Sequence, residues 1–338
     1  YILNSLIIFF GILIIRHFYL NATHNIEDVN PAIAGFLGGL GLPIIFSWIV
    51  GGLFAAGVAF VIGKVALGLR SDYLAIVTLG ISEIVVSVLK HEEWLSRGVK
   101  NVIGLKRPVP YEIDLQNADW FINLVTYLNS SKLNNIIDVS DRQQVLNNLI
   151  IDGSGIFVKL SYAILFLIVM LIIFYFANKA QLSPWGRMMR AIRDNETAAN
   201  AMGKDVVKQH LIIFVIGAAI VGVAGAMLVT LDGLFTPSGY RPLRFTFIIW
   251  IMVIVGGSGN NLGAIFGGFV IWFSWIEAAP LTTFIINQLT VGLEPTNALK
   301  LHLLDSVPYF RYLFMGLILL LILRYRPKGI IPEKVRHS

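Results

Sequence analysis

The chain has 338 residues, of which 56% are hydrophobic, 14% charged and 12% aromatic, and its mean hydropathy is +0.75. A soluble globular domain carries about 25% charged residues, so the composition excludes soluble, disordered and fibrous proteins and indicates an integral membrane protein. The absence of cysteine excludes disulfides and thiolate sites, and the net charge of +6 is compatible with nucleic acid or an acidic surface until the charges are located.

Apolar runs along the chain predict eight transmembrane helices. About 20 helical residues, at 1.5 Å per residue, cross the ~30 Å hydrocarbon core. Runs of this kind lie at about 1–19, 43–68, 72–90, 156–177, 210–231, 245–258, 260–279 and 307–324. The sequence therefore predicts an all-α, polytopic membrane protein with a single transmembrane domain over residues 1–338.

Three features qualify this count of spans. The break Gly256–Gly259 interrupts the pair around 245–279 and favours a re-entrant or broken helix. Pro31–Pro43, with four glycines, is a second candidate for irregular backbone at membrane depth. The chain starts at Tyr1 inside an apolar run, so we expect earlier residues, and earlier spans, to be missing from it.

The positive charge is concentrated in two short segments. Residues 179–209 carry six Lys and Arg against three acids, and the tail 324–338 carries five against one. These two segments hold more than the whole net charge of +6. Since Lys and Arg in short loops mark the cytoplasmic side, we expect a cytoplasmic loop at 179–209 and a basic cytoplasmic tail at 324–338. The charge thus indicates orientation in a membrane and no nucleic-acid partner.

A long connection, 91–155, is expected on the opposite side of the membrane. Within it Asp119 and Ser140 are candidate caps of two short amphipathic helices, with Gly153 as a stop signal for the second. Such helices lie on the bilayer surface or cover the helical bundle. The alternative is a docking platform for an extracytoplasmic partner.

Catalytic and cofactor motifs are not found. The six histidines are scattered and none forms a metal-binding H-E-x-x-H motif. The nearest approach to a phosphate-binding loop, Gly57 to Gly63-Lys64, has the wrong spacing and Val65 in place of Ser or Thr. We therefore expect no metal, no cofactor and no ATPase site in this chain, and no enzyme activity.

Glu83 is the most informative charge in the predicted spans. It lies eleven residues beyond Asp72, roughly 16 Å along the helix and near the bilayer centre, where a charge should face the bundle interior and have partners. Thr78 and Ser82 offer hydroxyls on the same helix. Two interpretations stay open: a polar point on a substrate pathway, or a buried carboxyl that joins helices.

Gly259, Gly263 and Gly267 recur at every fourth residue. In a membrane helix this spacing makes a groove into which a neighbouring backbone packs closely. Packing is the simpler meaning. The functional alternative is that the close-packed helices line a substrate path.

Residues 183–203 predict an amphipathic helix in the cytoplasmic loop. Ser183-Pro184 is a typical helix start, and Gly203 stands at the expected stop position. Between them Met188, Ile192, Ala199 and Met202 form an apolar stripe. Such a helix is either a solvated loop or membrane-surface helix, or an element that inserts into a groove on a cytosolic partner.

Four ordered stretches closely resemble branched-chain amino acid ABC transporter permeases of the LivM type. They are the loop 182–203, the segment 69–80 with Glu83, the segments 97–101 and 108–112, and Gly256–Gly259 with Gly263. The likeness covers almost the whole chain. One departure concerns the family's Glu-Ala-Ala-x-x-x-Gly loop pattern: here Thr197-Ala198-Ala199 precedes Gly203, and the acid stands one place earlier, at Glu196.

The resemblance implies an importer subunit of the bacterial inner membrane. Its partners would be a sister permease, two cytosolic ATP-binding subunits and a periplasmic substrate-binding protein. The loop helix would couple ATP hydrolysis to transport, through Arg187, Arg190, Arg193, Asp194, Glu196, Ala198, Ala199 and Gly203. The translocation pathway and its helix packing would involve Thr78, Ser82, Glu83, Gly259, Gly263 and Gly267.

Two alternatives remain beside import of branched-chain amino acids. Related permeases that carry urea or short amides share these motifs. A secondary transporter would show inverted repeats and paired intramembrane charges; the sequence shows no convincing repeat and one acid near mid-membrane.

Overall fold

The computed structural model describes residues 11, 13, 43–68, 71–92, 101–103, 105, 107–136, 138–240, 242–292, 294 and 297–333. Apart from Gly11, Leu13 and Pro43, the span expected at 1–19 and the segment Pro31–Pro43 lie outside these residues. The chain divides into two compact units, Tyr1–Gly239 and Tyr240–Ser338. This is a finer division than the single domain 1–338, and each unit is described by itself.

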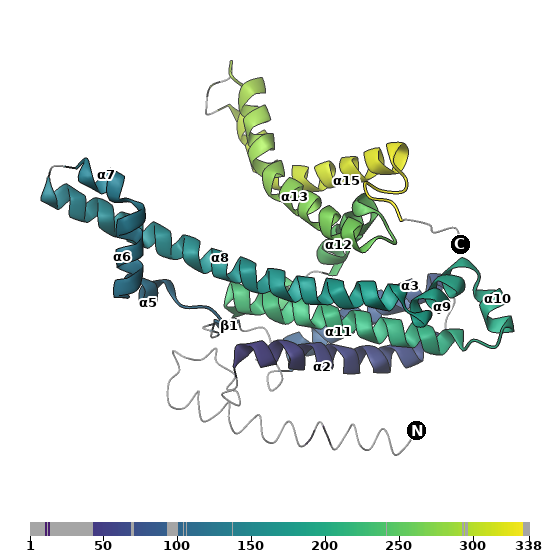
Figure 1. Cartoon of the computed structure of the whole chain (residues 1–338). Helices are drawn as coiled ribbons and strands as arrows, with labels where there is room; N and C mark the ends of the chain where they lie inside the picture. The colour runs from purple at the N-terminus through teal and green to yellow at the C-terminus, as the bar shows by residue number, and fades with distance from the viewer. Residues whose placement is uncertain are drawn as a thin grey trace. The chain divides into compact units, whose positions relative to one another are not determined.

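Three long helices form the centre of the first unit: α2 (Ile44–Ala66), α8 (Val139–Leu182) and α11 (Val206–Asp232). They run side by side (Figure 1). Their polar contact point is Thr230, which is 7% exposed. The Thr230 hydroxyl accepts a hydrogen bond from Trp48 Nε1 at 3.2 Å, and its carbonyl accepts one from the Tyr162 hydroxyl at 3.1 Å. Each of the three helices thus contributes one residue to this contact.

The contact between α2 and α11 depends on small residues. A Cβ built on Gly52 would lie 2.8 Å from Val223 Cγ2 and 3.0 Å from the Ala219 carbonyl oxygen, and one built on Gly222 would lie 2.5 Å from Ala55 Cβ. Lipid tails are as apolar as leucine, so membrane helices associate through close van der Waals packing. The glycines supply that closeness here. Beside α2 lies α3 (Ser71–His91), which also contacts the short 3-10 turn η2 (Pro237–Gly239).

The expected connection 91–155 is largely structured in the described part. A short antiparallel pair, β1 (Val102–Ile103) with β2 (Leu234–Phe235), ties it to the end of α11. Then follow α5 (Glu112–Gln116), α6 (Asp119–Leu128) and α7 (Ser130–Asn134), which pack against α8. Phe121 and Val125 of α6 are buried with Ile150 of α8, so these helices cover one end of α8 (Figure 1).

Three expected helix ends in this connection are wrong. Gly153 stops no helix, because it lies inside α8, which is 44 residues long in all, roughly 66 Å. Ser140 is not the cap: the Asp138 carboxylate accepts hydrogen bonds from the Ser140 hydroxyl and backbone N–H, and these bonds lower the pKa of Asp138 below its ordinary value. Asp119 is the first residue of α6, and the residue before it, Ala118, makes no side-chain cap.

The second unit is a helical hairpin with two further helices. α12 (Pro242–Gly256) turns back into α13 (Asn261–Leu289), and α14 (Ala298–Asp305) leads into α15 (Val307–Tyr325). Ile251, Ile271 and Met315, all fully buried, bring α12, α13 and α15 together. The expected break at 256–259 is a tight turn. The span expected to end at 279 continues through Pro280 to Leu289.

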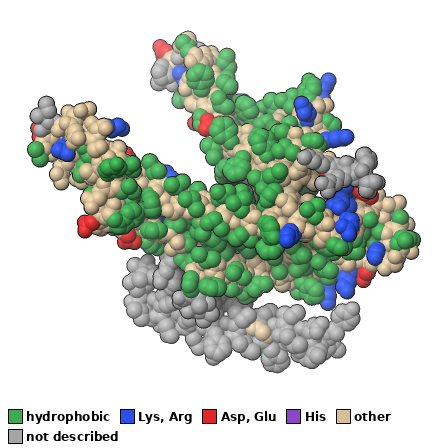
Figure 2. All heavy atoms as spheres, viewed as in Figure 1, with side chains coloured by type: hydrophobic (Ala, Val, Ile, Leu, Met, Phe, Trp, Pro, Cys, Tyr) green, Lys and Arg blue, Asp and Glu red, His purple; other side chains and the backbone are tan. Residues whose placement is uncertain are grey.

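The seven spans predicted from residue 43 onward each coincide with a helix. Within the described residues, α2, α8, α11, α13 and α15 are long and apolar enough to cross a membrane, and Phe245–Gly256 is a shorter apolar helix. The seventh, α3, has 21 residues but also carries Glu83 and Lys90. Hydrophobic side chains cover much of the surface (Figure 2), as expected where lipid replaces water. The chain is an all-α polytopic membrane protein.

Candidate functional site

The loop 179–209 contains two short helices where the sequence predicts one. α9 (Pro184–Asp194) starts as expected, with the Ser183 hydroxyl accepting from the Gly186 N–H. It ends at Asn195, whose backbone is extended (φ −156°) and whose side chain accepts from the Ala198 N–H at 2.9 Å. Asn195 thereby caps α10 (Glu196–Ala201). Gly203 follows with φ of +75°, a left-handed conformation suited to a residue just past a helix end.

The α9–α10 segment is tied to both neighbouring long helices. On one side, a Cβ on Gly186 would overlap the Ala180 and Gln181 carbonyl oxygens, so only glycine lets α9 cross the end of α8 this closely. On the other, Trp185 Nε1 donates to the Gln209 side chain at 3.0 Å. Gln209 is in the first turn of α11. Sequence reasoning missed Gly186 and Trp185, although the Pro184-Trp185-Gly186 run was visible.

An apolar cluster joins the two short helices to α11. Ile192 of α9, Ala199 of α10 and Val206 of α11 are buried together, with Met188 and Met189 packed against them. Of the four residues in the expected apolar stripe, Met202 is the exception, being 80% exposed. The α9–α10 segment is therefore packed directly against the start of α11.

The charged residues of the segment fall into two groups. Arg187 and Arg190 bond to the last carbonyls of α8: Arg187 Nη1 lies 3.4 Å from the Leu182 oxygen and Arg190 Nη1 2.9 Å from the Gln181 oxygen. Arg193 and Asp194 form an exposed ion pair at 3.3 Å, of a type worth about 0–1 kcal/mol. Glu196 is exposed at the start of α10. The first group thus connects α9 to the end of α8, and the second lies on the exposed surface of the segment.

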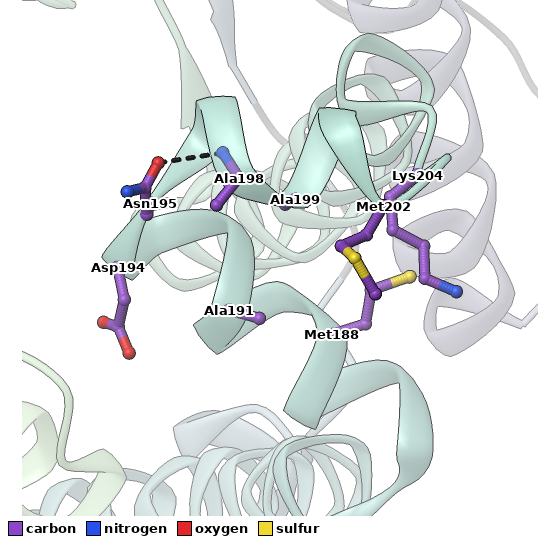
Figure 3. Close-up of a pocket in the computed structure, with 8 residues that line it drawn as sticks. All are labelled: Met188, Ala191, Asp194, Asn195, Ala198, Ala199, Met202 and Lys204. Atoms are coloured by element: carbon purple, nitrogen blue, oxygen red, sulfur yellow. Dashed lines mark hydrogen bonds between the residues drawn. The ribbon is translucent and has the colours of Figure 1, made fainter.

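A groove opens between α9 and α10 (Figure 3), with a cavity volume of about 290 Å³. It is lined by Met188, Ala191, Asp194, Asn195, Ala198, Ala199, Met202 and Lys204. The Met188, Met202 and Lys204 side chains gather at one end, and Asp194 and Asn195 lie at the other (Figure 3). Methionine surfaces adapt to varied partners. The groove thus has an adaptable apolar floor, with Lys204 at one end and Asp194, paired with Arg193, at the other.

Glu83 is exposed on α3 and makes no hydrogen bond or ion pair to another described residue. The hydroxyls expected near it bond to their own helix: Thr78 Oγ1 donates to the Leu74 carbonyl at 2.9 Å and Ser82 Oγ to the Leu79 carbonyl at 2.8 Å. The structure thus does not bring these three side chains together. A carboxyl that joins helices of this chain is not what the described residues show.

The three spaced glycines do not form one stripe. Gly263 and Gly267 are buried in α13, where a Cβ on Gly267 would lie 2.8 Å from the Gly256 backbone nitrogen. Gly259 lies before α13, in the turn with φ of +92°, and faces the Glu333 side chain. The expectation of a helical stripe is therefore wrong for Gly259, because α13 begins only at Asn261. The close contact of Gly263 and Gly267 is with the backbone of Gly256 in α12, which the sequence analysis did not predict.

The tail 324–338, described to residue 333, folds back onto the α12–α13 turn. Ile330 N–H donates to the Val255 carbonyl and Ile331 N–H to the Gly256 carbonyl, both at 2.9 Å. These are terminal carbonyls of α12, which have no partner within their own helix. Asn260 Nδ2 donates to the Pro332 carbonyl at 3.1 Å. The tail thus caps α12 and fastens the turn.

A metal site finds no support in the described part of the chain, where no three His, Asp or Glu side chains lie close enough together to hold an ion. The polar residues of interest for function lie in two places: in the α9–α10 segment, and on the apolar helices, as Glu83 does on α3.

Residues 9–323 match the family described as the permease component of the branched-chain amino acid transport system. A probable branched-chain amino acid transport permease protein LivM of Methanocaldococcus jannaschii is 26% identical over 93% of this chain and 74% of its own length. The LivM high-affinity permease protein of Escherichia coli is 28% identical over 84% of this chain.

The chain spans 56% of that Escherichia coli relative. A probable LivH permease protein of Methanocaldococcus jannaschii is 27% identical over 43% of the chain. No solved structure matches significantly. With the helical fold and the match over most of its length, this chain belongs to the family of branched-chain amino acid transport permease components.

Proposed function

We propose that the chain is the membrane-spanning subunit of an ABC importer, which moves branched-chain amino acids into the cytoplasm while separate subunits hydrolyse ATP. The observation that carries the proposal is the α9–α10 segment, an amphipathic pair fixed to the ends of α8 and α11. The matched relatives are named as branched-chain amino acid permeases, which supports the substrate class.

The α9–α10 segment is the proposed coupling element. An ATP-binding subunit would grip the groove between the two helices, and its closure would move the segment as one body. Since α8 is a single 44-residue helix, motion at its cytoplasmic end reaches the opposite side of the membrane. The spans then re-pack between outward-open and inward-open arrangements.

The remaining partners and the sidedness belong to the same proposal. The loop 179–209 and the tail 324–338 face the cytoplasm, and 91–155 faces the periplasm of a bacterial inner membrane. A sister permease, two ATP-binding subunits and a substrate-binding protein complete the importer. The covered N-terminal half of α8, with α5–α7, gives the periplasmic connection a firm surface for that binding protein.

Filling the groove tests the coupling role. Ala198→Trp, in vesicles that hold the full importer, is expected to lower ATP-dependent leucine uptake by about tenfold or more, because the indole occupies the space that a partner side chain would use. Membrane insertion should be unchanged, since Ala198 is exposed. The readouts are radiolabelled uptake and ATP hydrolysis stimulated by the binding protein.

Thr197→Trp is the matched control, because Thr197 is exposed on the same helix but does not line the groove. Equal losses in both variants, or full uptake in Ala198→Trp, would contradict the coupling role.

Comparing leucine with urea in the wild-type vesicles tests the substrate. Uptake of leucine without ATP would favour a secondary transporter.

Glu83 is the proposed polar point on the translocation pathway. Glu83→Gln is expected to lower leucine uptake by about tenfold while leaving association with the ATP-binding subunits intact, because a carboxylate at membrane depth is retained only where it has a task. Glu92→Gln, at an exposed residue just beyond the end of the same helix, is the control. Unchanged transport in Glu83→Gln would remove Glu83 from the pathway.

A further inference from the structure

The second unit holds an arginine within one of its apolar helices, α15. Arg311 is the fifth residue of α15, and its guanidinium carbon lies 5.7 Å from the centre of the Trp275 ring in α13. Trp275 is the middle residue of the 29-residue α13, roughly 21 Å from each end. Because α13 is longer than the ~30 Å hydrocarbon core, its midpoint falls inside the core wherever α13 crosses it. The guanidinium lies beside this midpoint, and Arg311 itself stands roughly 6 Å along α15 from Val307.

The surroundings of Arg311 leave its charge without an anion. It forms no ion pair with a described residue, and its Nε is buried without a hydrogen-bond partner among them. The favourable contact is the face of Trp275, which is itself held edge-on by Tyr312 at 5.4 Å. A ring face attracts a cation but accepts none of the guanidinium's hydrogen bonds. An anion that reached this point would gain more than it would at the protein surface.

Snorkelling to the membrane surface does not explain this placement. An arginine near a helix end can extend its side chain toward the lipid headgroups and water. Here the side chain bends onto α13 instead, which seals Nε between the two helices, while the residue as a whole stays half-exposed. Its remaining N–H donors, on Nη1 and Nη2, are the ones that a ligand would bond.

We infer that Arg311 receives the carboxylate of the transported amino acid as it crosses this unit. This inference rests on the proposed function, because it assigns a contact to the proposed substrate. A planar guanidinium binds a carboxylate through two parallel N–H donors. Trp275 and Tyr312 would fix the plane of the guanidinium, and the apolar walls of α13 and α15 would suit a branched aliphatic side chain.

The absence of cysteine from the chain makes a charge-restoration test possible. Arg311→Cys is assembled in the full importer, with the cysteines of the other subunits blocked. It is expected to transport leucine about tenfold more slowly than wild type. Ethylammonium methanethiosulfonate, which adds a positive charge, should restore much of the uptake. The negative ethylsulfonate and the neutral methyl reagent should not.

Protection from labelling identifies the source of the carboxylate. Leucine is expected to slow labelling of Tyr312→Cys, which leaves Arg311 in place, and leucinamide, which lacks the carboxylate, is not. When Arg311→Gln is added to Tyr312→Cys, the two compounds should have the same effect. Leu313→Cys, exposed on the same helix, is the matched control and should be labelled equally with either compound. Equal rescue by the neutral reagent would overturn the inference in favour of packing. Loss of the sister subunit from Arg311→Cys would overturn it in favour of a carboxylate on that subunit.

The proposed function and this inference fail in different ways. If wild-type vesicles take up no leucine with ATP, the proposed function fails whatever Arg311 does. If wild-type uptake is normal and Arg311→Cys transports leucine at the wild-type rate, the inference alone is overturned.

Discussion

Gly267→Val is expected to abolish folded permease and with it all leucine uptake. A Cβ at position 267 would overlap the Met252 carbonyl oxygen and lie 2.8 Å from both the Cα and the nitrogen of Gly256. These atoms belong to the backbone of α12, so no side chain can rotate out of the way. The hairpin would have to open, which exposes helix surfaces that depend on contact with each other.

Gly268→Val is the control for this substitution. Gly268 is the next residue of the same helix, and a Cβ there meets no atom within 4 Å, so the variant carries the same change in helix propensity without the clash. Size-exclusion chromatography in mild detergent and vesicle uptake measure the two variants. A monodisperse Gly267→Val protein with normal uptake would show that α12 and α13 do not pack this closely.

Opening the hairpin would also free the tail. Gly257 and Gly329 approach each other closely, and the tail bonds to the last carbonyls of α12. Gly267→Val should therefore make the tail accessible to protease at Lys328, while Gly268→Val leaves it protected. This readout separates loss of the hairpin from loss of transport alone.

The positions of the helices could be predicted from the sequence, because the bilayer demands about 20 apolar residues for every crossing. Their ends could not. Hydropathy does not reveal that α8 begins 17 residues before the apolar run that starts at 156, or that α13 continues past Pro280 to Leu289. Those ends are decided by packing against α5–α7 and by local caps, which hydropathy does not measure.

The start of the α9–α10 segment could be predicted, since Ser183-Pro184 is a local signal. The division at Asn195 could not, because it arises where a side chain caps the backbone three residues on in competition with a continuous helix. The position of Arg311 was also missed. Arg311 lies near the end of the apolar run 307–324. Only the fold shows that its side chain contacts Trp275, at the middle of α13.

The contact of α2 with α11 was missed although its signal was present. Ala218, Gly222 and Ala226 stand four residues apart, as do Gly51 and Ala55, which is the spacing of close-packed membrane helices. The stripe Gly259–Gly267 drew attention because it consists only of glycines. The mixed glycine and alanine stripes also make a close contact, and they join two of the three helices that meet at Thr230.

Gly222→Leu is the second substitution with a large expected effect. A Cβ at 222 would lie 2.5 Å from Ala55 Cβ and 2.9 Å from the Gly51 carbonyl oxygen, and leucine adds three carbons beyond it. Overpacking of this kind costs about 1–3 kcal/mol or more. The separation of α2 from α11 would also break the 3.2 Å bond of Trp48 to Thr230. We expect a lower Tm and impaired uptake.

Gly217→Leu and Gly225→Leu are the matched controls, because a Cβ at either position on α11 meets no atom within 4 Å. Thermal unfolding in detergent, followed by intrinsic tryptophan fluorescence, measures all three variants. Since α11 begins next to the proposed coupling element α9–α10, the Gly222→Leu protein that remains folded should also hydrolyse ATP without proportionate transport. A Tm equal to that of both controls would mean that α2 and α11 are not held together by this contact.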